Sequence, residues 1–404
     1  MKYFVRPRAL TMAAMCVLAG CLTPVFSQSE TAPRVFLMDA ARLKKVKAGY
    51  AAKDRDDTAA VGKIERDAKK AMSVGPFSIT EKTATPPSGD KHDYMTQAPY
   101  FWADPNKKDG LPYIRKDGER NPEILKYPDH GLLDKMESSV RALALGYYFT
   151  GDEAYAEKAA SLLRVFFIEP ATKMNPNLEY AQAIPGINTG RGIGLIETRG
   201  LTRVVDSIGL LDTSRSLTAK DRAGLQDWFG KFLAWMQESK NGKDESRSKN
   251  NHGTFYDVQI ASYALFTGKS DLARSILEDA KQKRIALQIE PDGRQPLELA
   301  RTKAWSYSLM NLDGLMDLAM LGRTSGVDLW NFETRDGRGI RKAVEFLYPF
   351  SLGEKWKYQQ IEEFKPEAFF TLMRRAGEIY TDDKFKAEEA KIPAAEGAAA
   401  KVLF

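Results

Sequence analysis

Cysteine and histidine are both scarce in this 404-residue chain. The only two cysteines, Cys16 and Cys21, lie close to the start, so the chain beyond residue 27 has no disulfide and no thiol chemistry. The three histidines, His92, His130 and His252, show none of the spacings that create a zinc site. We therefore expect no metal and no cofactor. The stability of the domain must come from packing.

Long apolar runs are also missing, except near the N-terminus. Lys2, Arg6 and Arg8 precede an apolar stretch at 9–20 that is too short for a permanent membrane span, so residues 1–27 are predicted to be an export signal. Leu18-Ala19-Gly20-Cys21 is typical of a lipoprotein signal, in which Cys21 becomes the lipidated N-terminus. Val25-Phe26-Ser27 suits ordinary cleavage instead. We favour the lipoprotein, which predicts a periplasmic or membrane-anchored protein that meets the membrane only through Cys21.

Strong charge of either sign is absent. The formal net charge is +6, and the predicted signal carries three basic and no acidic residues, so the remainder has a charge of only +3. This excess is too small to indicate a nucleic-acid partner, but it is compatible with an anionic substrate.

Strand patterns are scarce, whereas helical spacing of apolar residues recurs. Two helices are predicted over 36–72, the first opened by Asp39, and others over 132–168 and 219–239. The best strand candidate, 284–289, is explained equally well as a helix end. An aromatic-Thr-Gly/Asp turn occurs at 149–152, 266–269 and 380–383. In each case an alanine follows five residues beyond the Gly or Asp, at 156, 273 and 387. These repeated units predict an all-α fold of helical hairpins, closed as an α/α toroid over a single domain at 28–404.

Residues 76–130 interrupt the helical pattern with eight prolines spread among aromatic residues. An ordered loop region of this length forms either the wall of a binding site or a packed cap, and the sequence leaves both open. The polar segments 169–192 and 240–251 are expected to be loops at one end of the ring, where function would lie.

The segment Ser248–Gln259 sets Asn250, Asn251 and His252 directly before an apolar helical run. One simple interpretation is structural, because asparagine is a favoured N-cap and an isolated histidine is more often packed than catalytic. Arg301 and Tyr307 follow about fifty residues later. Tyr307, taken alone within Trp305-Ser306-Tyr307, would be a core residue. The combination of amide, imidazole, guanidinium and phenol is what indicates chemistry.

These four groups suit β-elimination in a uronic acid polymer. The reaction removes the proton at C5, beside the carboxylate, and expels the oxygen at C4. Asn251 and Arg301 can bind the carboxylate and stabilise the charge that develops on it. Tyr307 can act as base and then as acid, with His252 assisting it or acting as the base itself. In β-D-mannuronate and β-D-glucuronate the C5 proton and C4 oxygen share one side of the ring, so one tyrosine can serve both.

Asn250-Asn251-His252 with Arg301 and Tyr307 resembles the alginate lyase superfamily, and so do segments 94–105, 109–115 and 180–186 with Gly190-Arg191-Gly192. The resemblance implies an incomplete α/α toroid with Asn251, His252, Arg301 and Tyr307 as its catalytic residues. Family five usually has other residues where Gly253 and Ser308 stand, so the pattern is closer to lyases that accept glucuronan and mannuronan. Arg301 and Tyr307 are six residues apart, not seven. Arg301 must therefore lie at or before the helix start, or Arg294 replaces it.

Five further residues are candidates for lining the substrate cleft: Tyr100, Trp102, Tyr180, Gln182 and Arg191. Two other functions remain open from the sequence. A glycoside hydrolase on the same fold would need a pair of carboxyl groups, for which Asp257, Glu298 and Glu197 are available but not marked by spacing. A carbohydrate-binding lipoprotein without catalytic activity is the third possibility.

Overall fold

The helices begin at Asp39, whose carboxylate accepts hydrogen bonds from the amides of Ala41 and Arg42 and so caps α1 (Ala40–Ala51). Asp54 caps α2 (Arg55–Ala71) in the same way. Both helices expected over 36–72, and the start at Asp39, are confirmed. The computed structural model describes residues 1–3, 32–382, 385 and 402, so Cys16 and Cys21 lie outside the described residues.

Helical hairpins follow the predicted turns. Gly151 adopts a φ of 73° and ends α3 (Asp129–Thr150) before α4 (Glu153–Leu163), and Gly268 at 78° separates α8 (Asn251–Phe266) from α9 (Ser270–Ala280). Ala156 and Ala273 are fully buried where the paired helices approach. In the third turn Thr381 is left-handed at 49°, while the alanine at 387 lies outside the described residues.

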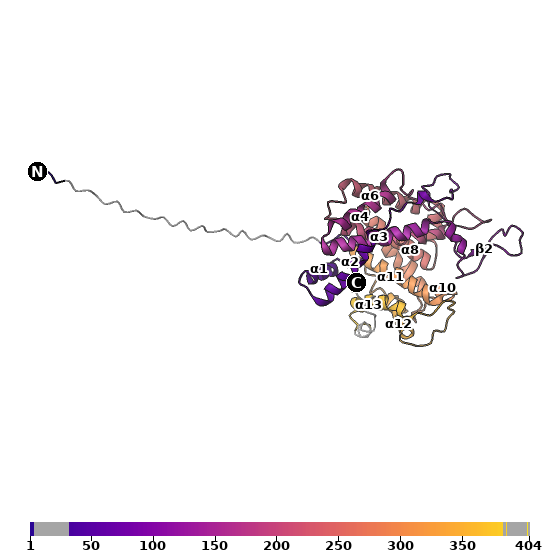
Figure 1. Ribbon diagram of the computed structural model, residues 1–404. Helices are drawn as coiled ribbons and strands as arrows, with labels where there is room; N and C mark the ends of the chain where they lie inside the picture. The colour runs from indigo at the N-terminus through magenta and orange to yellow at the C-terminus, as the bar shows by residue number, and fades with distance from the viewer. Residues whose placement is uncertain (4–31, 383–384, 386–401, 403–404) are drawn as a thin grey trace. The chain divides into compact units, whose positions relative to one another are not determined.

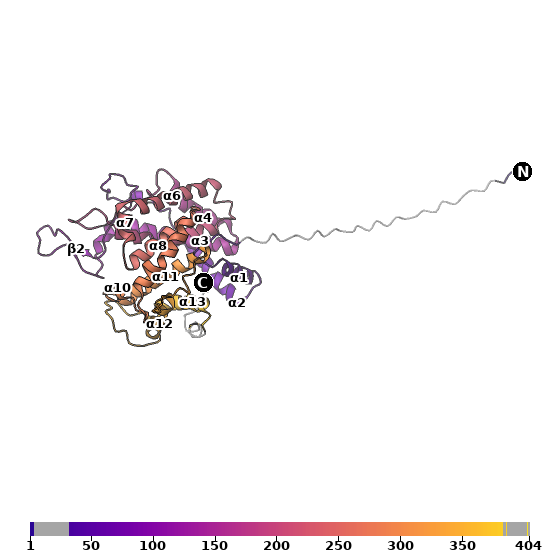
Figure 2. The same ribbon diagram turned by 180° about the vertical axis from the view of Figure 1, so that it is seen from behind.

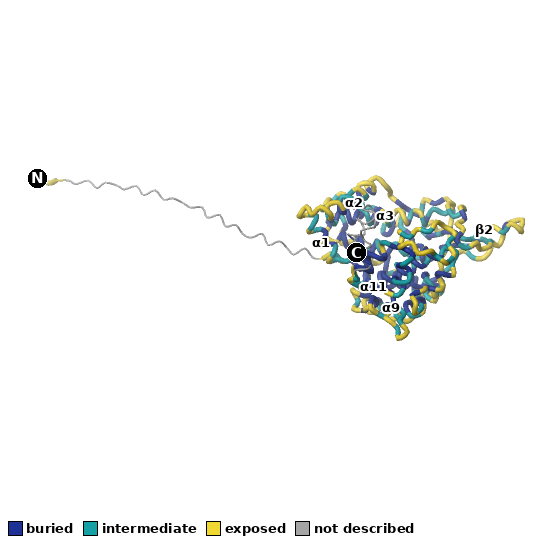
Figure 3. The backbone as a smooth tube through the Cα atoms, turned by 90° about the horizontal axis from the view of Figure 1, so that it is seen from below, coloured by how far each residue is buried: buried dark blue, intermediate teal, exposed yellow. Residues whose placement is uncertain are grey.

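The hairpins form a curved series (Figures 1 and 2). Helices α3, α5 (Leu201–Leu210), α8, α11 (Ala304–Ser325) and α13 (Phe370–Tyr380) are successive neighbours. Helix α4 packs on α3, α6 (Ala219–Glu238) and α9 pack on α8, and α12 (Ile340–Ser351) packs on α11 and α13. Helix α8 lies deepest, and His252 is its one residue that is not buried. Buried backbone accordingly fills the interior of the helical part in Figure 3.

Two small sheets lie in and beside the proline-rich region. Strand β1 (Met95–Gln97) pairs in parallel with β4 (Tyr180–Ala183). Strand β2 (Phe101–Trp102) pairs antiparallel with β3 (Ile114–Arg115), with Phe101 opposite Arg115 and Trp102 opposite Ile114. The loop carrying β2 projects beyond the helices in Figures 1 and 2. The region is therefore neither wholly loop nor a compact cap.

The structure corrects the expectation for one polar segment and decides between the two interpretations of a short apolar segment. Segment 240–251 is not only loop, because it contains α7 (Lys240–Ser246), which Ser239 caps through the amide of Gly242. Segment 284–289 is a helix end rather than a strand, since the π-helix η5 (Lys281–Ala286) runs into it. The remaining short elements are η1 (Ile79–Glu81), η2 (Pro122–Lys126), η3 (Arg164–Ile168), η4 (Gly192–Thr198), α10 (Pro296–Leu299) and η6 (Pro366–Phe369). Within the described part of the chain, no helix is both long and apolar enough to cross a bilayer.

Candidate active site

His252 is held by a buried carboxylate. Its Nδ1 lies 2.8 Å from Oε1 of Glu245, a residue of α7 whose side chain is only 1% exposed. The carboxylate also accepts a hydrogen bond from the Ser248 hydroxyl. Glu245 therefore fixes the proton of the imidazole on Nδ1, which leaves Nε2 as the nitrogen that can exchange a proton with another group. The His252 side chain keeps 16% of its surface exposed.

Asn251 is positioned by Glu298 of α10. Glu298 accepts two hydrogen bonds of 2.7 Å, one from the backbone nitrogen of Asn251 and one from its side-chain Nδ2. The N-cap of α8 is Asn250, yet its side chain makes no capping hydrogen bond, so neither asparagine caps the helix in the way that the structural interpretation expects. Oδ1 of Asn251 is buried and has no hydrogen-bond partner. A buried oxygen of this kind is costly unless a ligand or water satisfies it.

Burial raises the pKa of Glu298, and the two hydrogen bonds from Asn251 oppose that rise, as do the charges of Arg301 and His252. The charges of Arg301 and His252 thus lie close enough to Glu298 to influence it. The structure brings Asn251, His252 and Arg301 around this one carboxyl group.

Arg301 lies between α10 and α11, before the start of the helix, as its six-residue spacing from Tyr307 requires. Its guanidinium carbon is 3.9 Å from the centroid of the Tyr307 ring. Nε and Nη2 donate to the two oxygens of Asp117 at 3.1 and 2.8 Å. Arg294, the alternative arginine, instead pairs with Asp292.

Asp117 follows β3, and the Gly118 backbone beside it lies close to the side chain of Thr302, the residue after Arg301. Gly118 has a φ of 79°, and a Cβ there would stand 2.5 Å from Oγ1 of Thr302, so a larger residue would push the two loops apart. Thr302 also donates its hydroxyl to Asp117. Burial would raise the pKa of Asp117, but hydrogen bonds from Arg301 and Arg115 outweigh it and hold that pKa well below its usual range.

The Tyr307 hydroxyl donates a 3.0 Å hydrogen bond to the hydroxyl of Tyr100. Burial raises the pKa of Tyr307 well above its ordinary value, the hydrogen bond to Tyr100 adds to this rise, and the charge of Arg301 opposes it. Tyr307 is therefore protonated in the unliganded protein at neutral pH. Tyr100, expected to contact substrate, touches the candidate acid–base group directly.

The other expected cleft residues form two groups. Tyr180, Gln182 and Arg191 lie in and after β4, whereas Trp102 lies in β2. Gln182 accepts a 2.8 Å hydrogen bond from Arg191, whose guanidinium carbon lies 5.1 Å from the Phe101 ring centroid. Gln182 has a φ of 51°, a strained conformation for a residue with a Cβ and one that is concentrated at functional sites. Tyr180 is half-buried at the start of β4. Trp102 lies on the projecting hairpin, and its indole nitrogen donates to the Glu119 carbonyl.

Arg191 connects this group to the catalytic candidates. Burial lowers its pKa to about 10, and the charge of Arg115 contributes, while Glu197 and Glu245 oppose the change. Arg191 is thus near both Glu245, the partner of His252, and Arg115, a partner of Asp117. Its Nε is buried without a hydrogen-bond partner, which suits a group that receives an anionic ligand.

The three carboxylates available to a hydrolase all have fixed partners. Asp257 accepts two hydrogen bonds from Arg284, Glu197 accepts from Tyr94 and Thr96, and Glu298 holds Asn251. Each of them is buried. Because these hydrogen bonds already occupy all three carboxyl groups, the geometry does not favour hydrolysis.

Sequence reasoning missed Glu245 and Asp117 and gave Glu298 a different role. Glu245 stands in α7 among polar residues and a glycine, and it is the buried acidic residue of that helix, which the sequence alone does not mark. Asp117 is distant from Arg301 by 184 positions. Gly118 beside it is the one local signal of a close approach.

One protein family and several solved structures resemble this chain. Residues 78–356 match the family model described as alginate lyase. A crystal structure of an alginate lyase from Bacteroides ovatus is 42% identical, with a TM-score of 0.87, and the match covers 92% of this chain and 99% of that chain. No curated protein matches the chain.

More distant solved structures share the fold. Alginate lyase A1-III from a Sphingomonas species is 16% identical, with a TM-score of 0.54 over 89% of this chain and 93% of that chain. A variant of alginate lyase A1-III complexed with a tetrasaccharide is 15% identical, with a TM-score of 0.57 over 93% of this chain and 97% of that chain. The predicted all-α toroid is confirmed.

Proposed function

The chain belongs to the alginate lyase family and is a polysaccharide lyase, and from this premise we propose that it cleaves polyuronides of β-D-mannuronate or β-D-glucuronate by β-elimination, with Asn251, His252, Arg301 and Tyr307 as its catalytic residues. The observation that carries the proposal is the stacking of Arg301 on Tyr307 beside the Glu298 carboxyl that holds Asn251. A cation, a phenol and an amide with free hydrogen-bonding capacity thereby meet at one place.

Neutralisation of the substrate carboxylate comes first. Arg301 uses Nε and Nη2 to bind Asp117, which fixes the guanidinium plane, and Nη1 takes no part in those bonds. Asn251 uses one Nδ2 proton for Glu298, so its second proton is available to the uronate carboxylate and Oδ1 can accept from a sugar hydroxyl. These groups are fixed before substrate binds, so they stabilise the developing enolate-like charge without having to reorganise.

Proton transfer is assigned to Tyr307 with help from His252. Tyr307 must lose its proton before it can remove the one at C5, and the charge of Arg301 lowers the free energy of the phenolate. In this proposal His252 accepts that proton on Nε2, because Glu245 holds Nδ1. The neutral Tyr307 formed by taking the C5 proton then protonates the departing C4 oxygen.

Sugar binding is assigned to Tyr100, Trp102, Tyr180, Gln182 and Arg191. Aromatic rings can stack on pyranose faces, and Arg191 can bind the carboxylate of a neighbouring uronate. Two of the solved structures are variants of one enzyme, alginate lyase A1-III, complexed with a tetrasaccharide, which supports an oligosaccharide ligand here.

The test is an assay of the purified protein on mannuronan, glucuronan and a guluronate-rich alginate fraction. We expect unsaturated products that absorb in the ultraviolet from the first two, and little from the third, because guluronate has the opposite configuration at C5. Saturated reducing ends without ultraviolet absorbance would show hydrolysis and reject β-elimination.

Export and lipidation belong to the same proposal. A lipid anchor at Cys21 would hold the enzyme at a membrane surface where polymer fragments arrive. The support is the motif Leu18-Ala19-Gly20-Cys21 after a basic start and an apolar run.

A further inference from the structure

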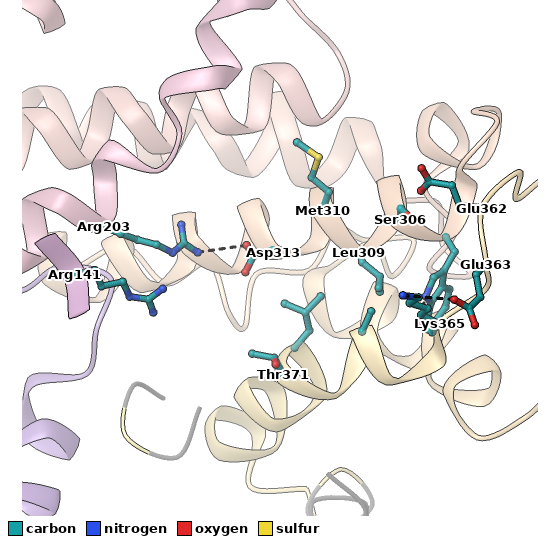
Figure 4. Close-up of a pocket in the computed structure, with 13 residues that line it drawn as sticks. Arg141, Arg203, Ser306, Leu309, Met310, Asp313, Glu362, Glu363, Lys365 and Thr371 are labelled. Carbon is teal, nitrogen blue, oxygen red and sulfur yellow. Dashed lines mark hydrogen bonds and ion pairs between the residues drawn. The ribbon is translucent and has the colours of Figure 1, made fainter. Parts of the chain in front are cut away.

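A cavity of about 690 Å³ lies along α11, on the side that carries Ser306, Leu309 and Asp313 (Figure 4). Helix α13 and the segment before it form the opposite wall, and Arg141 of α3 and Arg203 of α5 stand at one end. The volume is in the range of small-molecule sites. None of the nine residues assigned above to catalysis or sugar binding lines this cavity.

Arg141 is the unusual feature of the cavity. Its side chain points into the space in Figure 4, and in the described part of the chain it has no ion pair and no hydrogen bond to a side chain or backbone. Its Nε is inaccessible to solvent and has no partner. An arginine whose Nε is buried without a hydrogen-bond partner, and which has no ion pair, is incompletely compensated, so such a group points to a ligand that supplies the missing contacts.

The other charges of the cavity already have partners. Asp313 and Asp317 are shared between Arg203 and Arg375, which places two acidic groups against two basic groups. Glu362 pairs with Lys303, and Glu363 pairs with Lys365. Among the cations that line the cavity, Arg141 is therefore the one without an ion pair in the part of the chain that the structure describes.

Glu137, one helical turn before Arg141 on α3, does not supply the missing charge. Burial raises the pKa of Glu137 to about 8, with Asp134 adding to the rise, so Glu137 is mostly neutral at pH 7. Its carboxyl lies against Gly200, where a Cβ would stand 1.8 Å from Oε2. Arg141 and Glu137 form no ion pair.

The walls favour an organic anion over a bare inorganic one. Trp305, Leu309 and Leu372 present apolar surface beside the hydroxyls of Ser306 and Thr371. Apolar faces with a few hydroxyl partners suit a pyranose ring, and the guanidinium suits a carboxylate, with which it can form two parallel hydrogen bonds.

We propose that this cavity is a second uronate-binding site, in which Arg141 binds the carboxylate of an acidic sugar against the apolar wall of α11. The choice of a uronate as ligand rests on the proposed function, whereas the presence of an anion site does not. Because Ser306 is the residue next to Tyr307, the site would hold a sugar close to the catalytic tyrosine but on a different side of α11.

The test measures binding of labelled glucuronate by equilibrium dialysis, which needs no turnover. Arg301→Gln serves as the background, so that the catalytic carboxylate site contributes little. We expect this variant to bind glucuronate, the added change Arg141→Gln to weaken binding at least tenfold, and the added change Arg274→Gln, on the exposed surface of α9, to leave it unaltered. Neutral glucose should not compete.

Two results would overturn the inference. Equal glucuronate binding with and without Arg141 would remove the site, and competition by inorganic sulfate as strong as that by glucuronate would reduce it to a site for inorganic anions. Thermal unfolding guards against misfolding, because removing a partly buried charge that has no ion pair should leave the melting temperature unchanged or higher. A protein without lyase activity that still showed Arg141-dependent binding would refute the proposed function and leave the site standing.

Discussion

The guanidinium carbon of Arg301 lies 3.9 Å from the centre of the Tyr307 ring. Arg301 lies before α11 and Tyr307 lies in the first turn of that helix. If both were in one regular helix they could not stack, because a spacing of six residues would place them about 240° apart around the helix axis. Asp117 holds the other edge of the guanidinium in two hydrogen bonds. This Asp117–Arg301–Tyr307 arrangement is the central element of the proposed mechanism.

Replacing Asp117 with asparagine should loosen Arg301. The variant loses the charge that orients the guanidinium, so we expect kcat/KM on polyuronide to fall by about 10²-fold, the effect of a small misplacement of a catalytic group. The free energy of unfolding should fall by roughly 1–3 kcal/mol, since a partly buried ion pair is broken. Asp109→Asn, on the same projecting loop, is the matched control. Unchanged or higher kcat/KM in Asp117→Asn would show that Asp117 competes with the substrate instead of positioning Arg301.

Replacing Glu245 with glutamine should impair His252 without disturbing the fold. The amide oxygen can still accept the Nδ1 hydrogen, but the charge that stabilises a protonated imidazole is gone. We expect kcat to fall by about 10²-fold with KM little altered, and Glu238→Gln, near the end of α6, to have no effect. Loss confined to KM would assign Glu245 to substrate binding instead.

How far the sequence predicts this molecule depends on whether the signal is local. The turn at Phe149–Asp152 requires a residue that tolerates positive φ, and the close packing beyond it requires alanine, so the hairpins can be predicted from a few neighbouring positions. Asn251 and His252 stood out because polar groups precede a strongly apolar helix. Asp117 did not stand out, because its contact with Arg301 depends on how two distant loops approach at Gly118.

Burial of polar residues was the least predictable feature. Asn250 and Asn251 fit the composition of an N-cap, yet their side chains do not cap α8, since Glu298 supplies the partner of the Asn251 amide from another element. The sequence predicts a loop where α7 forms, because six polar residues and a glycine carry no apolar periodicity. Its formation is explained by the Ser239 cap and by burial of Asn241, Gly242 and Glu245 against the site.

Stability should depend on pH through Glu137. Its pKa is raised to about 8 in the folded protein, so the folded state retains a proton that the unfolded state loses near its ordinary pKa. The contribution is therefore complete below that ordinary pKa and is lost as the pH rises to about 8. We expect Glu137→Gln to be more stable than the wild type at pH 9, by on the order of a few kcal/mol, and the difference to shrink at pH 5. Urea unfolding at both values measures it, with exposed Glu157→Gln as control. A constant difference across pH would contradict the assignment.

Lipidation at Cys21 can be tested in a bacterial host supplied with labelled palmitate. The wild type should incorporate label and partition into the detergent phase, whereas Cys21→Ser should do neither, because serine lacks the thiol that accepts the lipid. Cys16→Ser is the control and should be labelled normally. An unlabelled wild-type protein whose mature chain begins at Gln28 would establish ordinary signal cleavage instead.

The most direct test of the central claim compares Tyr307→Phe with Tyr100→Phe. Both variants remove one hydroxyl of the same hydrogen bond, so their effects on folding should be alike, but only Tyr307 is assigned to proton transfer. Rates of ultraviolet absorbance on mannuronan or glucuronan should fall by at least 10²-fold in Tyr307→Phe and by much less in Tyr100→Phe. Full activity in a folded Tyr307→Phe variant would contradict the mechanism.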